Sequence, residues 1–157
     1  MENKDKKYML DAIRLSSENI DSGGGPFAAI IVKDGKIISA ATNSVTADND
    51  PTAHAEINAI RKACKALNSF DLSGCVIYTS CEPCPMCLGA IYWAHIDKVF
   101  YGNTKDDARK IGFDDSFIYK EMELPLKKRK IEFEQLLHDE AFKAFIKWHK
   151  SDNKTEY

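Results

Sequence analysis

The chain has 157 residues, of which 44% are apolar and 29% are charged. This length suits one domain with a buried core, and the composition is typical of globular proteins rather than disordered chains. The formal net charge of −2 offers no basic surface, so we expect no nucleic-acid partner. Because no apolar run reaches membrane-spanning length and the charged N-terminus is not a secretory signal, we expect a cytoplasmic protein without a membrane partner.

The N-terminal segment predicts a helix followed by a β-hairpin. Apolar residues recur at helical spacing over residues 5–20, and Gly23-Gly24-Gly25-Pro26 ends this pattern. Two apolar segments, 27–32 and 36–41, then flank Asp34-Gly35, a dipeptide typical of tight hairpin turns.

The remainder of the chain alternates helical and extended patterns. Asp50 and Pro51 have the residue types of a helix cap and first turn, so we expect a helix from there to Leu67. Further elements follow: a buried strand at 76–79, a helix ending at Ala94, a strand at 98–101, an irregular stretch at 104–125, an edge strand at 131–135 and a helix at 139–149. This alternation predicts an α/β fold with a partly parallel sheet, in a single domain spanning residues 1–157.

The five cysteines do not form a disulfide pattern. Their number is odd, and three of them lie close together at positions 81, 84 and 87. In a reducing compartment such a cluster indicates metal binding or catalysis rather than cross-linking.

Two fragments carry metal-binding chemistry, His54-Ala55-Glu56 and Cys84-Pro85-Met86-Cys87. One histidine and two cysteines are three ligands of the kinds that zinc prefers, and they leave its fourth position to water. His-x-Glu followed by Pro-Cys-x-x-Cys is also the signature of zinc deaminases that act on nucleobases. The sequence therefore predicts a catalytic Zn²⁺ site and the hydrolytic removal of an exocyclic amine from a base.

The spacing of these residues restricts where the site can lie. Glu56 follows His54 by two residues, so on a regular helix their side chains point about 200° apart. Both can face one site only if that site lies end-on, above the first turn. A helix N-terminus also favours thiolate over thiol at Cys84 and Cys87. Placed there, Glu56 would take a proton from water, pass it to a ring nitrogen and then protonate the leaving amine.

Two other metal sites remain alternatives. Cys81, Cys84 and Cys87 resemble the start of an iron–sulfur run, but no fourth cysteine follows Cys87. A structural zinc site would close if Cys81 joined His54, Cys84 and Cys87 as a fourth ligand. Pro83, after the predicted strand, favours a Cys81 side chain that points elsewhere.

Four segments resemble the cytidine-deaminase superfamily and, within it, the bacterial guanine deaminases: residues 24–27, 51–56, 79–93 and 112–119. The zinc-site segments mark the superfamily, whereas Phe-Asp-Asp-Ser-Phe-Ile-Tyr at 113–119 is the more specific mark. The resemblance runs from about Gly23 to Tyr119, with an echo in the closing Glu156-Tyr157. It implies a three-layer α/β/α fold with a mixed five-stranded sheet.

By this resemblance, His54, Cys84 and Cys87 hold Zn²⁺, Glu56 moves protons, and Asp115 is a second catalytic carboxylate. The residues implied to contact the purine are Phe27, Asn43, Ala55, Asp114 and Tyr157. A carboxylate suits guanine because N1 and N2 present N–H donors. The implied reaction is the hydrolysis of guanine, a small-molecule purine, to xanthine and ammonia.

The substrate and the assembly have competing interpretations. A tRNA wobble adenosine deaminase shares the Pro-Thr-Ala-His-Ala-Glu segment, although it would need a basic face for RNA. Cytosine and guanosine deaminases are further alternatives, and a zinc-stapled binding module is a non-enzymatic one. The resemblance also implies a homodimer in which segments of about 139–157 are exchanged, so that Tyr157 closes the pocket of the partner.

Overall fold

A four-stranded mixed sheet, in the order β2-β1-β3-β4, forms the centre of the first part of the chain. The computed structural model describes residues 3–157, which divide into a unit ending at Asp115 and a second unit, Ser116–Tyr157. The strands are β1 (Ala28–Lys33), β2 (Lys36–Thr42), β3 (Cys75–Cys81) and β4 (Lys98–Asn103). β1 runs antiparallel to both β2 and β3, whereas β3 and β4 are parallel.

The expectation of five strands is wrong. Residues 131–135 adopt no strand, and they belong to the second unit, where the structure describes helices and irregular segments alone. A strand is stabilised by pairing with a neighbour, and no strand exists in that unit to supply one.

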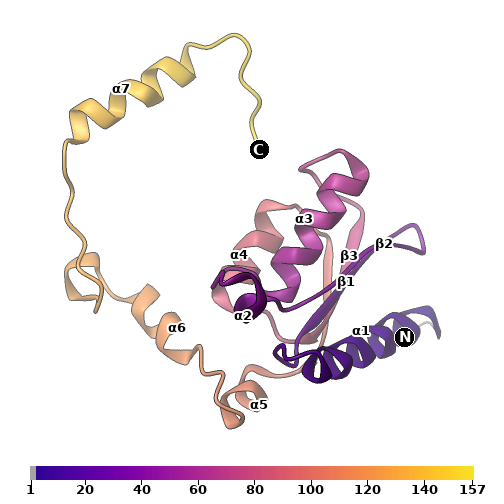
Figure 1. Cartoon of the computed structure of the whole chain (residues 1–157). Coiled ribbons are helices and arrows are strands. Elements are labelled where there is room, and N and C mark those ends of the chain that lie inside the picture. The colour runs from indigo at the N-terminus through magenta and orange to yellow at the C-terminus, as the bar shows by residue number, and fades with distance from the viewer. Residues whose placement is uncertain (1–2) are drawn as a thin grey trace. The chain divides into compact units, whose positions relative to one another are not determined.

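Helices cover both faces of the sheet and confirm the layered α/β/α arrangement (Figure 1). Helix α1 (Asn3–Asp21) packs on one face, against β1 and β3. Helices α3 (Ala55–Leu67) and α4 (Pro85–Trp93) lie on the other, and they contact each other. The parallel pair β3 and β4 is joined through α4, which forms a β-α-β unit.

Strand β1 is buried on both faces, which explains its continuous apolar sequence. Alternate residues of β1 pack into two different hydrophobic cores, one on each face of the sheet. Ala29 and Ile31 belong to the core beneath α3 and α4, and Ile30 and Val32 to the core beneath α1. Each fully buried isoleucine contributes about 1.5–3 kcal/mol relative to exposure.

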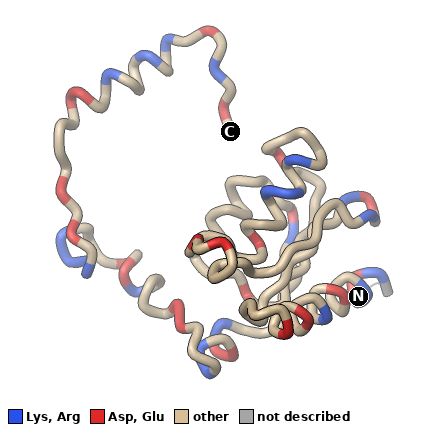
Figure 2. Tube along the Cα trace, in the orientation of Figure 1, with Lys and Arg blue, Asp and Glu red and all other residues tan. Residues whose placement is uncertain are grey.

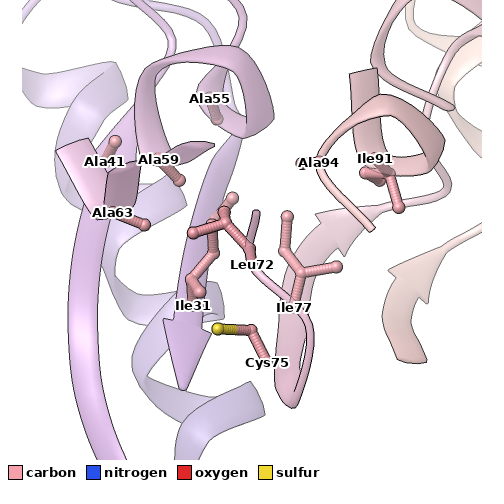
Figure 3. Close-up of a cluster of buried hydrophobic side chains, with 11 residues drawn as sticks. Ile31, Ala41, Ala55, Ala59, Ala63, Leu72, Cys75, Ile77, Ile91 and Ala94 are labelled. Carbon is pink, nitrogen blue, oxygen red and sulfur yellow. The ribbon is translucent and has the colours of Figure 1, made fainter. Parts of the chain in front are cut away.

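The core beneath α3 and α4 is shown in Figure 3. Helix α3 presents small side chains to the sheet, at Ala55, Ala59 and Ala63. These alanines let the helix approach Ile31 and Ile77 closely, so the start of α3 is held firmly against the sheet.

The hairpin predicted at Asp34-Gly35 is confirmed. Asp34 has a φ of 50° and Gly35 a φ of 72°, so both central residues are left-handed as a type I′ turn requires. The turn joins β1 to β2 directly.

The predicted start of the second helix is wrong. The helix begins at Ala55, not at Asp50-Pro51, and a short helix, α2 (Val45–Asp48), precedes it. The Asp50 carboxylate accepts hydrogen bonds from the Thr52 backbone N–H (2.8 Å) and hydroxyl (2.7 Å). Asp50 thereby stabilises a local turn rather than capping a helix.

Residues 104–125, expected to be irregular, contain helices α5 (Lys105–Lys110) and α6 (Ser116–Glu123). Thr104 and Asp107 form a capping box that starts α5. The second unit continues with a 3₁₀ turn, η1 (Leu126–Lys128), and α7 (His138–His149), which confirms the helix predicted at 139–149. Within residues 3–157, no helix is both long and apolar enough to cross a membrane.

Candidate active site

Two helix N-termini position the central residues of the site. His54 is the N-cap residue of α3, and Cys84 is the N-cap residue of α4, with Pro85 immediately after it. Both have extended backbone conformations, and neither uses its side chain to cap its own helix. Their side chains therefore lie end-on to the two helices, as the spacing of His54 and Glu56 requires.

His54, Cys84 and Cys87 form one cluster. The Sγ atoms of Cys84 and Cys87 each lie 3.5 Å from His54 Nδ1, and all three ligand atoms are within 4.8 Å of one another. Cys87 is fully buried, and the other two residues are half-buried. The cluster is therefore partly accessible to solvent.

The donor set fits zinc. With Zn–N of about 2.0–2.1 Å and Zn–S of about 2.3 Å, a tetrahedral angle separates nitrogen and sulfur by about 3.6 Å. The Sγ–Nδ1 distances of 3.5 Å match this value. Imidazole and thiolate are ligands that zinc prefers, and three of them leave one position for water or substrate.

Protons in the cluster are distributed unequally. A hydrogen bond with Cys87 lowers the pKa of Cys84 to about 4, and His54 adds to this effect. The same Cys84–Cys87 hydrogen bond, together with burial, raises the pKa of Cys87. A hydrogen bond with Cys84 also raises the pKa of His54. Cys84 is thus a thiolate at neutral pH, and its negative charge stabilises a positive charge on the neighbouring His54 ring.

Glu56 lies next to this cluster in the first turn of α3. It is 7% exposed, and its Oε2 lies 3.4 Å from Cys87 Sγ. Burial raises the pKa of its carboxyl group. A buried carboxylate with a raised pKa beside three clustered metal-ligating residues is suited to accept and release protons.

Thr79, to which the sequence patterns assigned no role, contacts Glu56. Thr79 is 2% exposed on β3, and its hydroxyl lies 3.3 Å from Glu56 Oε1 and 3.0 Å from the Cys81 carbonyl. The contact joins residues 23 positions apart. No local motif could reveal it, although Thr79 opens the segment that carries the cysteines.

Asp115 and Asp114 differ in their surroundings. Asp115 is half-buried, and burial and then the nearby Cys84 thiolate raise its pKa. Asp114 is exposed. Because Cys84 raises the pKa of Asp115, the two groups lie close enough to interact, which favours Asp115 over Asp114 as the second carboxylate.

The other predicted substrate contacts differ in their burial and in the unit to which they belong. Phe27 is half-buried and packs edge-on against Phe113, at a centroid distance of 4.9 Å. Asn43 follows β2 and is half-buried. Ala55 is fully buried in the core, so it could reach a substrate only through its backbone. Tyr157 belongs to the second unit and is 74% exposed.

Cys81 does not join the cluster. Its Sγ lies 3.8 Å from the Thr104 carbonyl, and burial raises its pKa to about 11. It is therefore a thiol at neutral pH, on the side of β3 facing Thr104. This arrangement argues against a closed four-ligand zinc site.

The geometry of the cluster agrees with a comparison of the whole sequence. A family model described as the cytidine and deoxycytidylate deaminase zinc-binding region matches residues 2–103. The chain belongs to this deaminase family. The matched range contains His54, Glu56, Cys84 and Cys87, whereas Asp115 and the second unit lie beyond it.

Individual deaminases show how far the likeness extends. Guanine deaminase of Bacillus subtilis is 54% identical over 151 residues, which cover 96% of this chain and 97% of the relative. The tRNA-specific adenosine deaminase of Aquifex aeolicus is 47% identical over 97 residues, covering 61% of this chain and 64% of the relative.

Solved deaminase-like structures give the same picture. The crystal structure of B. subtilis guanine deaminase is 52% identical, with a TM-score of 0.95, and the match covers 100% of this chain and 99% of that one. A protein solved in complex with 2,6-diaminopurine is 38% identical, with a TM-score of 0.67, over 69% of this chain and 61% of that one. The likeness to guanine deaminase therefore includes both units of this deaminase chain.

Proposed function

We propose that this chain hydrolyses guanine to xanthine and ammonia, using one bound Zn²⁺. The observation that carries the proposal is the 54% identity to a guanine deaminase over 96% of the chain. The charges also favour a small substrate over RNA. Apart from the short run Lys127-Lys128-Arg129-Lys130, Lys and Arg residues are interspersed with Asp and Glu along the chain (Figure 2), and the net charge is −2.

His54, Cys84 and Cys87 would hold the ion. When bound, Zn²⁺ would act as a Lewis acid that lowers the pKa of a water molecule toward neutrality. The two helix N-termini support the thiolates at this position, because their positive ends face the cysteines.

Glu56 would move the protons. It accepts a proton from the attacking water as the water oxygen bonds to C2 of guanine, and it delivers this proton to the adjacent ring nitrogen. It then takes the proton from the hydroxyl group on C2 and passes it to the exocyclic nitrogen, so that the C2 carbonyl forms as the C2–N bond breaks and ammonia leaves. The burial that raises the pKa of Glu56 allows both directions of transfer, and the Thr79 hydroxyl orients the carboxylate.

The purine would be recognised by Asp115, Asn43 and Phe27. The Asp115 carboxylate accepts from ring N–H groups, the Asn43 amide pairs with another edge of the base, and the Phe27 ring packs on its face. Asp115 would also assist proton delivery to the leaving amine. Ala55 through its backbone and Tyr157 complete the proposed set, and the exposed Asp114 is the alternative carboxylate to Asp115.

We also propose a cytoplasmic location. None of the five cysteines forms a disulfide bond. Burial raises the pKa of Cys64 and Cys75, so these two are inert thiols away from the site. Unpaired cysteines of this kind are typical of reducing compartments.

The second unit supports a proposed homodimer with exchanged C-terminal segments. None of its residues is buried, and Phe142, Phe145 and Trp148 of α7 are 49%, 72% and 49% exposed. These side chains line an apolar hollow on α7 together with Ile146 and His149. A unit without a buried core needs another surface to cover its apolar side chains, and exchange between identical chains supplies one. The exchanged part would begin near Ser116, earlier than residue 139.

Ammonia release from a substrate panel tests the function. The panel contains guanine, guanosine, adenine, cytosine and a tRNA anticodon stem-loop. We expect free guanine to give the highest kcat/KM. Faster deamination of adenosine in the stem-loop would establish the tRNA-editing alternative, and release from none of them by the zinc-loaded protein would favour a binding module.

A further inference from the structure

Asn19, in the last turn of α1, links the two loops that carry Phe27 and Asn43. Its Nδ2 donates to the Gly25 carbonyl at 2.7 Å and to the Asn43 carbonyl at 3.0 Å. An amide nitrogen has two hydrogens, so both bonds form at once. Because both acceptors are carbonyl oxygens, they determine which end of the amide faces them.

The backbone of Asn19 also forms hydrogen bonds with the loop that carries Gly24 and Gly25. Its carbonyl accepts from the N–H groups of Ser22 at 3.2 Å and Gly24 at 2.9 Å. Gly24 also packs tightly on the side chain, since a Cβ placed there would lie 2.3 Å from Asn19 Nδ2. The loop is thus fitted around this amide, and no side chain can be added at Gly24 without displacing it.

Gly25 packs against both candidate purine contacts, Phe27 and Asn43. A Cβ at Gly25 would lie 3.3 Å from the Phe27 ring and 3.5 Å from Asn43 Oδ1. The Phe27 N–H donates to the Gly25 carbonyl at 2.9 Å, and the Asn43 N–H donates to the Phe27 carbonyl at 3.1 Å. Gly25, Phe27 and Asn43 therefore form one closely packed group, to which Asn19 is bonded at two points.

We propose that Asn19 is a positioning residue for base recognition: its side-chain amide fixes the Phe27 ring relative to the Asn43 amide. The inference rests on the proposed function, because it takes Phe27 and Asn43 as contacts of guanine. Asn19 is itself neither one of the proposed base contacts nor one of the clustered metal-ligating residues. Its contribution is to hold the two contacts in the binding geometry before the base arrives, which removes an ordering cost from binding.

A double-mutant cycle tests the proposal, with the zinc-loaded full chain and guanine as substrate. Loss of two hydrogen bonds in Asn19→Ala should raise KM about fivefold and change kcat less than about twofold. In the Asn43→Ala background the same change should raise KM only about twofold, because one of the two positioned groups is already gone. Ser22→Ala is the matched control. Its hydroxyl bonds to the Glu18 carbonyl at the same helix end, and KM should stay at the wild-type value.

Gly24→Ala provides an independent variant, since its methyl group displaces the Asn19 amide without removing it. It should also raise KM, and again less so with Asn43→Ala; if Asn19→Ala does not fold, this pair decides the test. Equal fold-changes in both backgrounds would show a general structural role and overturn the proposal, as would a wild-type KM in Asn19→Ala and Gly24→Ala. A wild-type protein that does not deaminate guanine would instead overturn the proposed function, before any variant is compared.

Discussion

At the scale of single residues, burial separates the roles of the charged groups near the cluster. Glu56 is 7% exposed, and its raised pKa follows mainly from that burial. Asp115 is only half-buried, so solvent moderates its shift. Two carboxylates with different environments can take different parts in one reaction, one beside the attacking water and one at the base.

Replacing Glu56 by glutamine should abolish turnover and keep the metal. The amide is nearly isosteric but cannot accept a proton, so kcat should fall at least about 10²-fold. Zinc content by atomic absorption should remain about one per chain, because Glu56 is not among the three clustered ligands. Cys87→Ala is the contrasting variant and should lose both zinc and stability. Near-normal activity in Glu56→Gln would refute the proton-transfer role.

Asp115→Asn should weaken guanine turnover more than it affects zinc. An amide can present N–H to a ring N–H, and such a mispaired group costs roughly 1–3 kcal/mol, or about 5- to 150-fold in kcat/KM. Asp114→Asn is the matched control on the exposed neighbour and should change kcat/KM less than about twofold. Equal effects of the two substitutions would contradict the assignment of Asp115.

At the scale of elements, local signals predicted those parts of the fold that depend on neighbours in sequence. The Asp34-Gly35 hairpin and α7 are examples, because turn chemistry and helical periodicity are local. The capping box at the start of α5 is also a local signal, and it explains why a helix forms within a stretch expected to be irregular. The absent strand at 131–135 could not be excluded, because strand formation depends on a partner elsewhere in the chain.

In the candidate site, too, the residues found from the sequence are those with a local spacing pattern, and the residues missed are those with long-range contacts. The His-x-Glu and Cys-x-x-Cys spacings identified the residues that the structure brings together. The start of α3 was misplaced, since Asp50 forms a turn with Thr52 instead of a cap. Thr79 and Asn19 escaped prediction, because their contacts with Glu56 and Asn43 join segments more than 20 positions apart.

The close packing of β4 against β3 at Gly102 gives a prediction about the free energy of unfolding. A Cβ at Gly102 would lie 2.9 Å from the Ser80 backbone carbonyl, so Gly102→Ala must shift one strand. We expect a loss of about 1–3 kcal/mol in the free energy of unfolding, measured in urea. Gly89→Ala, in α4, is the control. A Cβ there meets nothing within 4 Å, so helix propensity should raise stability by up to about 1 kcal/mol. Equal stabilities for the two variants would contradict the close contact.

At the scale of the whole molecule, the second unit is the part whose stability needs explanation. Helices α6 and α7 carry six apolar side chains that are 42% or more exposed: Phe117, Met122, Phe142, Phe145, Ile146 and Trp148. Leu137, just before α7, is 68% exposed. Large exposed apolar surfaces mark interaction sites. An exchanged dimer would cover them and could bring Tyr157 to a substrate pocket.

Deleting residues 151–157 tests the terminal part of this arrangement. The truncated chain should keep its zinc and its fold, because no residue of that segment is buried. If Tyr157 closes the pocket of the partner, KM for guanine should rise or kcat should fall about three- to tenfold. Sedimentation of the full-length protein should show a dimer at assay concentration. Unchanged kinetics after truncation, or a full-length monomer, would contradict the proposal.

The most direct test of the central claim is the stoichiometry and metal dependence of guanine turnover. Xanthine and ammonia are measured together, first with the zinc-loaded protein, then after chelation, and finally after zinc is restored. We predict equal amounts of xanthine and ammonia, loss of both with the metal, and recovery on adding one equivalent of Zn²⁺. Guanine left unchanged by the zinc-loaded protein, or turnover that survives complete removal of zinc, would contradict the account.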